Sequence, residues 1–168
     1  MTAFEIHDIQ KLTGLLLGGT MFDNFLLSEA TVTQAFTCTI DGSLHAGYFS
    51  EEELEEGSLA GLPCIPYARV RPLCLELLKG KRKPQFFKFV FLLSPQNQER
   101  TIQSAGSNVS PEDVTGMFLN LTYRNNRLVC TTGVSYRTFT LDKSLEREWD
   151  RMALVFFRQR GIAVESLT

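Results

Sequence analysis

Three side chains in the first third of the chain could form an acid–base or metal-binding group. They are Glu29, Asp41 and His45. A histidine beside carboxylates can transfer protons near neutral pH or ligate a metal ion. No second histidine at ligand spacing, no nucleophile and no HExxH pattern accompanies them, so a solvated turn histidine is the simpler interpretation. The sequence therefore favours a non-enzymatic role over an enzyme with a small-molecule substrate, and predicts no metal site and no cofactor.

A basic segment offers different chemistry, the neutralisation of phosphates. Lys79, Lys81, Arg82 and Lys83 flank Gly80, and Lys88 follows within a run of phenylalanines. Cations beside aromatic rings can bind a nucleic acid through ion pairs and base stacking. A solvated turn, with Lys79 placed at the negative end of a preceding helix, explains the same residues more simply. Nucleic-acid binding is therefore the alternative hypothesis rather than the leading one.

Charge and cysteine use narrow the class of protein further. The 17 basic and 19 acidic residues leave a net charge of -2, which gives no long-range attraction to nucleic acid or anionic lipid. The four cysteines, Cys38, Cys64, Cys74 and Cys130, include no CxxC pair, which is typical of buried thiols in a reducing compartment. No apolar run is long enough to span a bilayer. We expect a cytoplasmic protein that has no membrane partner.

The periodicity of the chain predicts the elements that position these residues. Helices are expected at residues 4–17, 67–79, 94–106 and 144–161, with a short capped helix after Ser50 and another after Ser110. Alternating segments at 25–32, 36–40, 86–93, 117–123, 127–132 and 134–141 predict about six strands. Residues 86–93 are apolar on both sides, which favours a central strand. Asn125-Asn126 suits a tight hairpin turn.

The order of these elements favours an α+β fold. Strands in hairpins, rather than regular βαβ alternation, predict a mainly antiparallel sheet of about six strands with helices packed mostly on one face. No linker or repeat divides residues 1–168, so a single domain is expected. The other sheet face would then collect polar side chains, with Phe86 or Phe118 interspersed. The members expected there are Thr37, Thr39, Lys88, Asn120, Thr122, Arg124, Thr131 and Arg137.

Four segments of the chain, considered together, resemble a known family. They are Thr20–Ala30, Thr39–Gly42, Leu78–Arg82 and Thr138–Glu146. The sequence is similar to an uncharacterised bacterial family that carries only a domain-of-unknown-function label. The resemblance extends over roughly residues 4–161. It implies a small, stand-alone bacterial cytoplasmic protein and brings no reaction, ligand or site residue.

Without a catalytic pattern, the leading hypothesis is a binding or assembly module that uses its polar sheet face or a sheet edge. Such a face could meet another protein or a second copy of the chain. The acidic run Glu51–Glu56 is most simply a solvated helix start. The alternative is that this acidic run pairs with the basic turn of a neighbouring subunit, at residues 79–83.

Overall fold

The computed structural model describes residues 1–106 and 108–167, and its centre is one eight-stranded sheet. The strand order is β3-β2-β5-β6-β7-β1-β8, with β4 beside β2, and every pairing described is antiparallel. The bounds are β1 (Ala3–Ile6), β2 (Phe25–Thr33), β3 (Thr37–Asp41), β4 (Ile65–Pro66), β5 (Phe86–Leu93), β6 (Val114–Arg124), β7 (Arg127–Tyr136) and β8 (Val164–Ser166). The predicted α+β class is confirmed.

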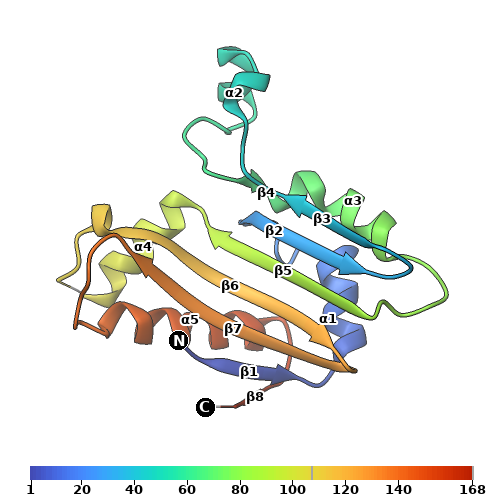
Figure 1. The fold of residues 1–168 in the computed structure, drawn as a ribbon. Helices are drawn as coiled ribbons and strands as arrows, with labels where there is room; N and C mark the ends of the chain where they lie inside the picture. Colours follow the sequence, from blue (N-terminus) through green and yellow to red (C-terminus); the bar gives the residue numbers. More distant parts are fainter. Residues whose placement is uncertain (107, 168) are drawn as a thin grey trace.

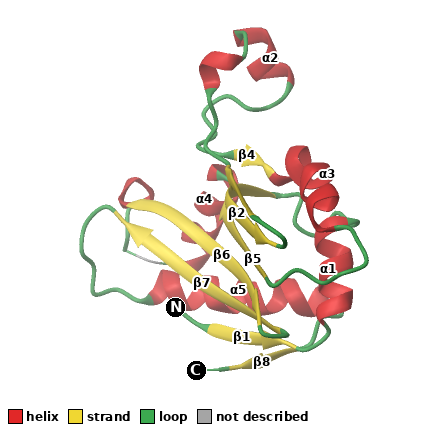
Figure 2. Cartoon of the chain, turned by 45° about the vertical axis from the view of Figure 1, so that its right-hand side comes forward, coloured by secondary structure: helices red, strands yellow, loops and turns green. Residues whose placement is uncertain are grey.

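Four helices cover one face of this sheet (Figures 1 and 2). They are α1 (Ile9–Leu17), α3 (Tyr67–Leu78), α4 (Pro95–Ala105) and α5 (Ser144–Gln159). Two of them, α1 and α4, begin with a side-chain cap. Ser94, for example, caps α4 by accepting a hydrogen bond from the Asn97 backbone N–H, with Pro95 as the first helical residue. The short helix α2 (Glu51–Glu56) lies apart from the others.

The core fills the space between the sheet and the four helices. Phe89 and Phe91 of β5 are fully buried, and the Phe91 ring stacks on Phe22 with centroids 4.8 Å apart. Two polar groups of this layer are paired: the Tyr67 hydroxyl donates to the Leu16 carbonyl, and the Trp149 indole N–H donates to the Phe118 carbonyl at 2.9 Å. The expectation that β5 is an interior strand is confirmed, since it lies between β2 and β6.

The N-terminal segment differs from its prediction. Residues 4–17 are not one helix, because Ala3–Ile6 form β1 between β7 and β8, and Asp8 then caps α1 by accepting from the Lys11 backbone N–H. Phe4 and Ile6 are buried as alternate strand residues. The expected strand at 134–141 is likewise wrong, because β7 ends at Tyr136. The short strands β1, β4 and β8 raise the count above the six expected.

Residues 42–64, which we call the arm, extend beyond the end of the sheet where β3 ends (Figure 1). Its two sides pair at the root, where the Leu44 backbone N–H donates to the Pro63 carbonyl and the Ile65 N–H donates to the Gly42 carbonyl. The tip carries α2, which starts with the predicted capping box of Ser50 and Glu53. The arm is therefore held by backbone hydrogen bonds at its root and carries a helix at its tip.

Candidate functional site

The sheet face opposite the four helices, which we call the open face, carries no helix among the described residues (Figures 1 and 2). Residues paired across antiparallel strands lie on the same face, so the register places its members. One row crosses β3, β2, β5, β6 and β7 through Thr39, Thr31, Lys88, Thr122 and Val129 in turn. All of these but Thr39 are half-buried, as in a pleated surface with close neighbours.

The neighbouring row on the side of the arm crosses the same five strands. It contains Asp41, Glu29, Val90, Asn120 and Thr131. The Asn120 amide donates to the Thr131 hydroxyl at 3.2 Å, so part of the polar surface is already satisfied within the sheet. Half-buried apolar side chains, among them Val90 and Val129, are interspersed among these polar groups. The face is thus mixed in chemistry.

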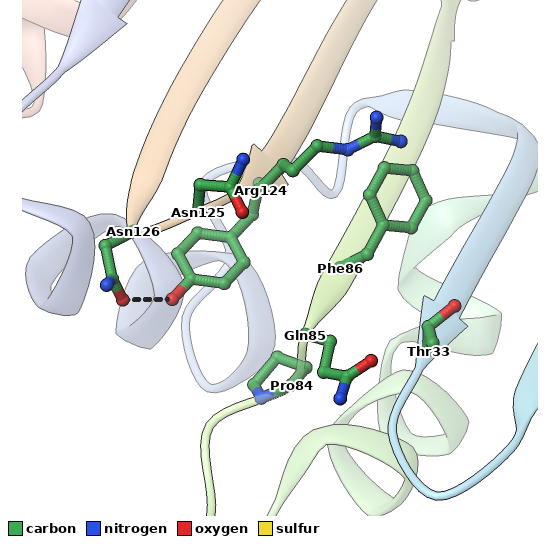
Figure 3. Close-up of a pocket in the computed structure, with 8 residues that line it drawn as sticks. Thr33, Pro84, Gln85, Phe86, Arg124, Asn125 and Asn126 are labelled. Carbon is green, nitrogen blue, oxygen red and sulfur yellow. Dashed lines mark hydrogen bonds between the residues drawn. The ribbon is translucent and has the colours of Figure 1, made fainter.

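One end of the open face, which we call the basic end, is where β5 begins. The Arg124 guanidinium lies over the Phe86 ring, 4.8 Å from its centroid (Figure 3). A hollow of about 560 Å³ next to this pair is lined by Thr33, Pro84, Gln85, Phe86, Tyr123, Arg124, Asn125 and Asn126. Asn125 and Asn126 form the predicted hairpin turn with φ of +53° and +59°. The Tyr123 hydroxyl donates to the Asn126 side-chain oxygen at 3.1 Å, which fixes the rim.

The basic turn adjoins the same end. Lys81, Arg82 and Lys83 are exposed and line a second hollow of about 670 Å³, together with the start of α1 and the residues Tyr123 and Asn126 shared with the first hollow. Lys79 differs from these three, because its ammonium forms an ion pair with Glu76 at 2.8 Å. Lys88 stands on the open face itself, in β5. Of the predicted basic residues, Lys81, Arg82 and Lys83 therefore lie together in the turn. Lys88 lies apart from them on the open face, and Lys79 is already paired with Glu76.

Arg127 also lies at the basic end but is neutralised locally. Its guanidinium donates to the Glu5 carboxylate of β1 at 2.7 Å, and this hydrogen bond lowers the pKa of Glu5. Sequence reasoning missed the pair, because residue 5 was assigned to a helix instead of a strand. The charges at this end that have no carboxylate partner among the described residues are those of Lys88, Arg124 and the basic turn.

Toward the arm the open face is acidic, and we call this part the acidic end. Glu29 and Asp41 are directly paired across β2 and β3, and the chain continues from Asp41 into the arm. The Ser43 backbone N–H donates to the Asp41 carboxylate at 2.9 Å, and this bond lowers the pKa of Asp41. The arm then adds the exposed carboxylates of α2. Carboxylates without a basic partner therefore concentrate where the arm leaves the sheet.

The predicted polar cluster of Glu29, Asp41 and His45 is not assembled into a cavity. Glu29 and Asp41 lie on the sheet, whereas His45 is exposed at the start of the arm's first turn. Neither Asp41 nor His45 lines any of the four hollows described. Among the described residues no group of three or more histidines, cysteines and carboxylates is placed to hold a metal ion. The geometry gives acid–base chemistry here no support.

The arm covers the edge of the open face at its acidic end. Leu26 and Leu92, neighbours on that face, pack with Cys64 from the arm root to form a small second apolar cluster, with Leu62 and Phe118 against it. Burial raises the pKa of the Cys64 thiol, as it does for Cys74 and Cys130. All four cysteines are free, and these three are not activated nucleophiles. The cluster anchors the arm to the sheet.

The structure places most of the predicted sheet-face residues on the open face. Thr37, Thr39, Lys88, Asn120, Thr122 and Arg124 all lie there by register. Arg137 does not, because it follows the end of β7, where its backbone N–H donates to the Asp113 carbonyl. Sequence reasoning found the alternation but missed the arm, whose cues were the acidic run and the flanking glycines and prolines.

One family profile, described as a family of unknown function (DUF5721), matches residues 15–165. The match spans most of the 168 residues, from α1 to β8, and includes the whole arm. The chain belongs to the DUF5721 family. No curated protein and no solved structure matches it. Membership confirms the resemblance to a domain of unknown function and assigns no activity. In the part of the chain that the structure describes, no helix is long and apolar enough to cross a membrane.

Proposed function

We propose that the chain is a non-enzymatic assembly module that forms a homodimer through its open face. The observation that carries this proposal is a broad sheet face, uncovered among the described residues, on which apolar and hydrogen-bonding side chains alternate. We also propose that it acts in the bacterial cytoplasm, as the family resemblance implies. Its four free thiols suit a reducing compartment.

The size of the open face supports an interface. From β3 to β1 it crosses six strands, and spacings of about 4.8 Å make it roughly 24 Å wide. Along β6 the members run from Phe118 to Arg124, roughly 20 Å at about 3.4 Å per residue. The projected area is then on the order of 500 Å², to which side-chain relief adds. That is the scale of a standard interface, which buries about 800 Å² per partner.

The composition of the face also suits burial against another sheet. Half-buried Phe86, Val90, Phe118 and Val129 supply apolar contact area. The Asn120–Thr131 bond and the Thr33–Thr37 hydroxyl pair at 2.9 Å satisfy polar groups that would otherwise lose water on burial. Two such faces can stack about 10 Å apart with their strands within about 30° of each other.

The substitution Thr122→Arg tests the proposal at the middle of the face. Thr122 pairs with Lys88 on one side and Val129 on the other, so an arginine there adds bulk and places a second cation beside Lys88. We expect the dimer to weaken by about 100-fold, the effect of burying an unpaired charge that costs about 3 kcal/mol. Size-exclusion chromatography with light scattering across a concentration series measures the change.

A matched control is Gln103→Arg, which adds the same side chain to the exposed surface of α4. It should leave the dimer unchanged, and both variants should unfold with similar midpoints in urea. A wild-type chain that remains monomeric over the whole concentration series contradicts the proposal. So does a Thr122→Arg variant that dimerises as well as Gln103→Arg does.

A second candidate function is nucleic-acid binding at the basic end. The observation that favours it is the pair of adjoining hollows around Pro84, Tyr123 and Asn126, one lined by Lys81–Lys83 and the other by Phe86 and Arg124. A single strand could place phosphates on the turn and a base on the Phe86 side. This site is separate from the centre of the open face.

The triple variant Lys81→Ala, Arg82→Ala, Lys83→Ala tests the second candidate. If the turn contacts three phosphates, the salt slope of single-strand binding should fall by about 2, because each contact contributes roughly 0.7. Fluorescence anisotropy with labelled oligonucleotides from low to moderate salt measures this slope. Lys79→Ala is the control, since its ammonium is already paired with Glu76. If wild type does not bind the oligonucleotide at low salt, or if the triple variant has the same salt slope as wild type, this candidate function is contradicted.

A further inference from the structure

The open face carries opposite charge at its two ends. Arg124 and the basic turn lie where β5 begins at Phe86, and Lys88 lies in the next row along the strand. Glu29, Asp41 and the arm lie toward the other end, where β3 finishes. Figure 1 shows the arm beyond one end of the strands and the segment that joins α3 to β5 beyond the other. The face therefore has a charge gradient along its strands.

This gradient selects between two ways of stacking two copies face to face. A two-fold axis parallel to the strands would place basic end on basic end. A two-fold axis that crosses the strands reverses the strand direction of the second copy and places each basic end on the other's acidic end. Like charges brought together at an interface cost several kcal/mol, whereas opposite charges attract and steer association. The crossing axis is the favoured one.

The same axis aligns the parts that overhang the sheet. It preserves the order of strands across the interface, so β2 and β5 of one copy lie over β2 and β5 of the other. The arm leaves the sheet from β3 and β4, which pair with the same edge of β2, and the basic turn enters the sheet at β5, which pairs with the other edge of β2. The arm of each copy thus overhangs in the direction of the other copy's turn. A closed, isologous contact of this kind occurs twice in the dimer.

We propose that the open face docks on a second copy with strands antiparallel, so that the arm helix α2 of each copy contacts the basic turn of the other. The inference rests on the proposed homodimer and specifies its arrangement. Glu51, Glu52, Glu55 and Glu56 are exposed and form no ion pair within residues 1–106 and 108–167. Lys81, Arg82 and Lys83 share both properties.

The arm also presents an apolar group suited to such a contact. Tyr48 is 85% exposed and packs edge-on against Phe49, with centroids 5.2 Å apart. An aromatic ring beside a row of carboxylates can bury its face against the stems of lysine and arginine while the charges pair. The arm and the basic turn of one copy lie at opposite ends of its own sheet, so this pairing requires two chains.

Charge reversal in two separate chains tests the arrangement. The arm variant carries Glu52→Lys, Glu55→Lys and Glu56→Lys, which spare the Ser50–Glu53 capping box. The turn variant carries Lys81→Glu, Arg82→Glu and Lys83→Glu. Each variant alone should dimerise about 100-fold more weakly than wild type, because both copies of the contact become repulsive. Sedimentation velocity over a concentration series measures both dissociation constants.

Mixing the two variants provides the decisive result. In the heterodimer, the lysines of the arm variant face the glutamates of the turn variant, and the unaltered arm faces the unaltered turn. Both contacts are attractive again, so the mixture should form heterodimer at close to wild-type affinity and weaken as salt rises. Co-purification through a tag on one variant detects it. A single chain with all six reversals should also recover the dimer and restores the net charge of -2.

The outcomes separate this inference from the proposed function. If each variant dimerises like wild type, or the mixture gains nothing, the antiparallel docking with arm and turn is overturned, while sensitivity to Thr122→Arg would still support an open-face dimer. If wild type never dimerises, the docking arrangement and the proposed homodimer are both contradicted. Circular dichroism of each variant verifies that α2 and the sheet remain folded before either conclusion is drawn.

Discussion

Replacing Phe91 by alanine is expected to lower the free energy of unfolding by about 4 kcal/mol, within the range for a buried phenylalanine. Phe91 has no solvent exposure and lies in the interior strand β5. Its ring stacks on Phe22 at 4.8 Å and meets Tyr67 edge-on at 5.0 Å. Both neighbours belong to the helix-covered side, so truncation leaves a cavity among large rings that cannot all shift to fill it.

The neighbouring substitution Val90→Ala is the control for this prediction. Val90 points to the open face, where it is only half-buried, so its truncation should cost about 1 kcal/mol in the monomer. Urea unfolding monitored by Trp149 fluorescence at low protein concentration measures both free energies. Equal costs for the two variants would mean that the two sides of β5 are not differently packed, which contradicts the register and burial described above.

The contrast between these adjacent residues shows why much of the fold was predictable. Alternation in a strand is a local property, so residues 86–93 and 117–123 could be assigned with their inward and outward sides. Caps are also local, and both Ser50 and Ser94 act as predicted. The same locality explains the error at the N-terminus. Ile6, Ile9 and Leu12 follow one another at a helical spacing of three residues. Ile6 nevertheless pairs with Leu128 of β7, a partner that no short window contains.

The candidate site was predictable only in part, for a related physical reason. Period-two alternation identified which side chains share the open face, but what covers a face depends on where helices dock. It also gave no information on the arm, whose root is fixed by backbone hydrogen bonds between residues far apart, such as Leu44 and Pro63. Asp41 and His45 are close in sequence, yet Asp41 ends a strand and His45 precedes a short helical turn within the arm.

The substitution Gly42→Ala is expected to destabilise the protein by about 3 kcal/mol, because the root of the arm has no room for a methyl group. A Cβ at this position would overlap the Leu27 carbonyl oxygen and lie 2.7 Å from the Leu27 carbonyl carbon. Both are backbone atoms next to the irregularity of β2 at Ser28, so no side-chain rotation relieves the overlap. Gly42 must move away from β2.

That movement would also break the bonds that position the arm. The Gly42 N–H donates to the Ser28 carbonyl at 2.9 Å, and its carbonyl accepts from Ile65 at 2.8 Å. The arm should therefore loosen, become more sensitive to limited proteolysis within residues 42–64, and reach the partner's basic turn less well. Urea unfolding gives the first effect, protease digestion the second, and sedimentation the third.

Gly47→Ala is the matched control for Gly42→Ala, because it makes the same change in the same arm where a Cβ meets nothing within 4 Å. Its unfolding free energy should be equal to that of wild type or higher by about 0.5 kcal/mol, since alanine restricts the unfolded chain. Should Gly42→Ala match Gly47→Ala in stability and protease resistance, the close approach of the arm root to β2 would be refuted. Should it lose stability but retain full dimer affinity, the arm would be anchored as described without contributing to assembly.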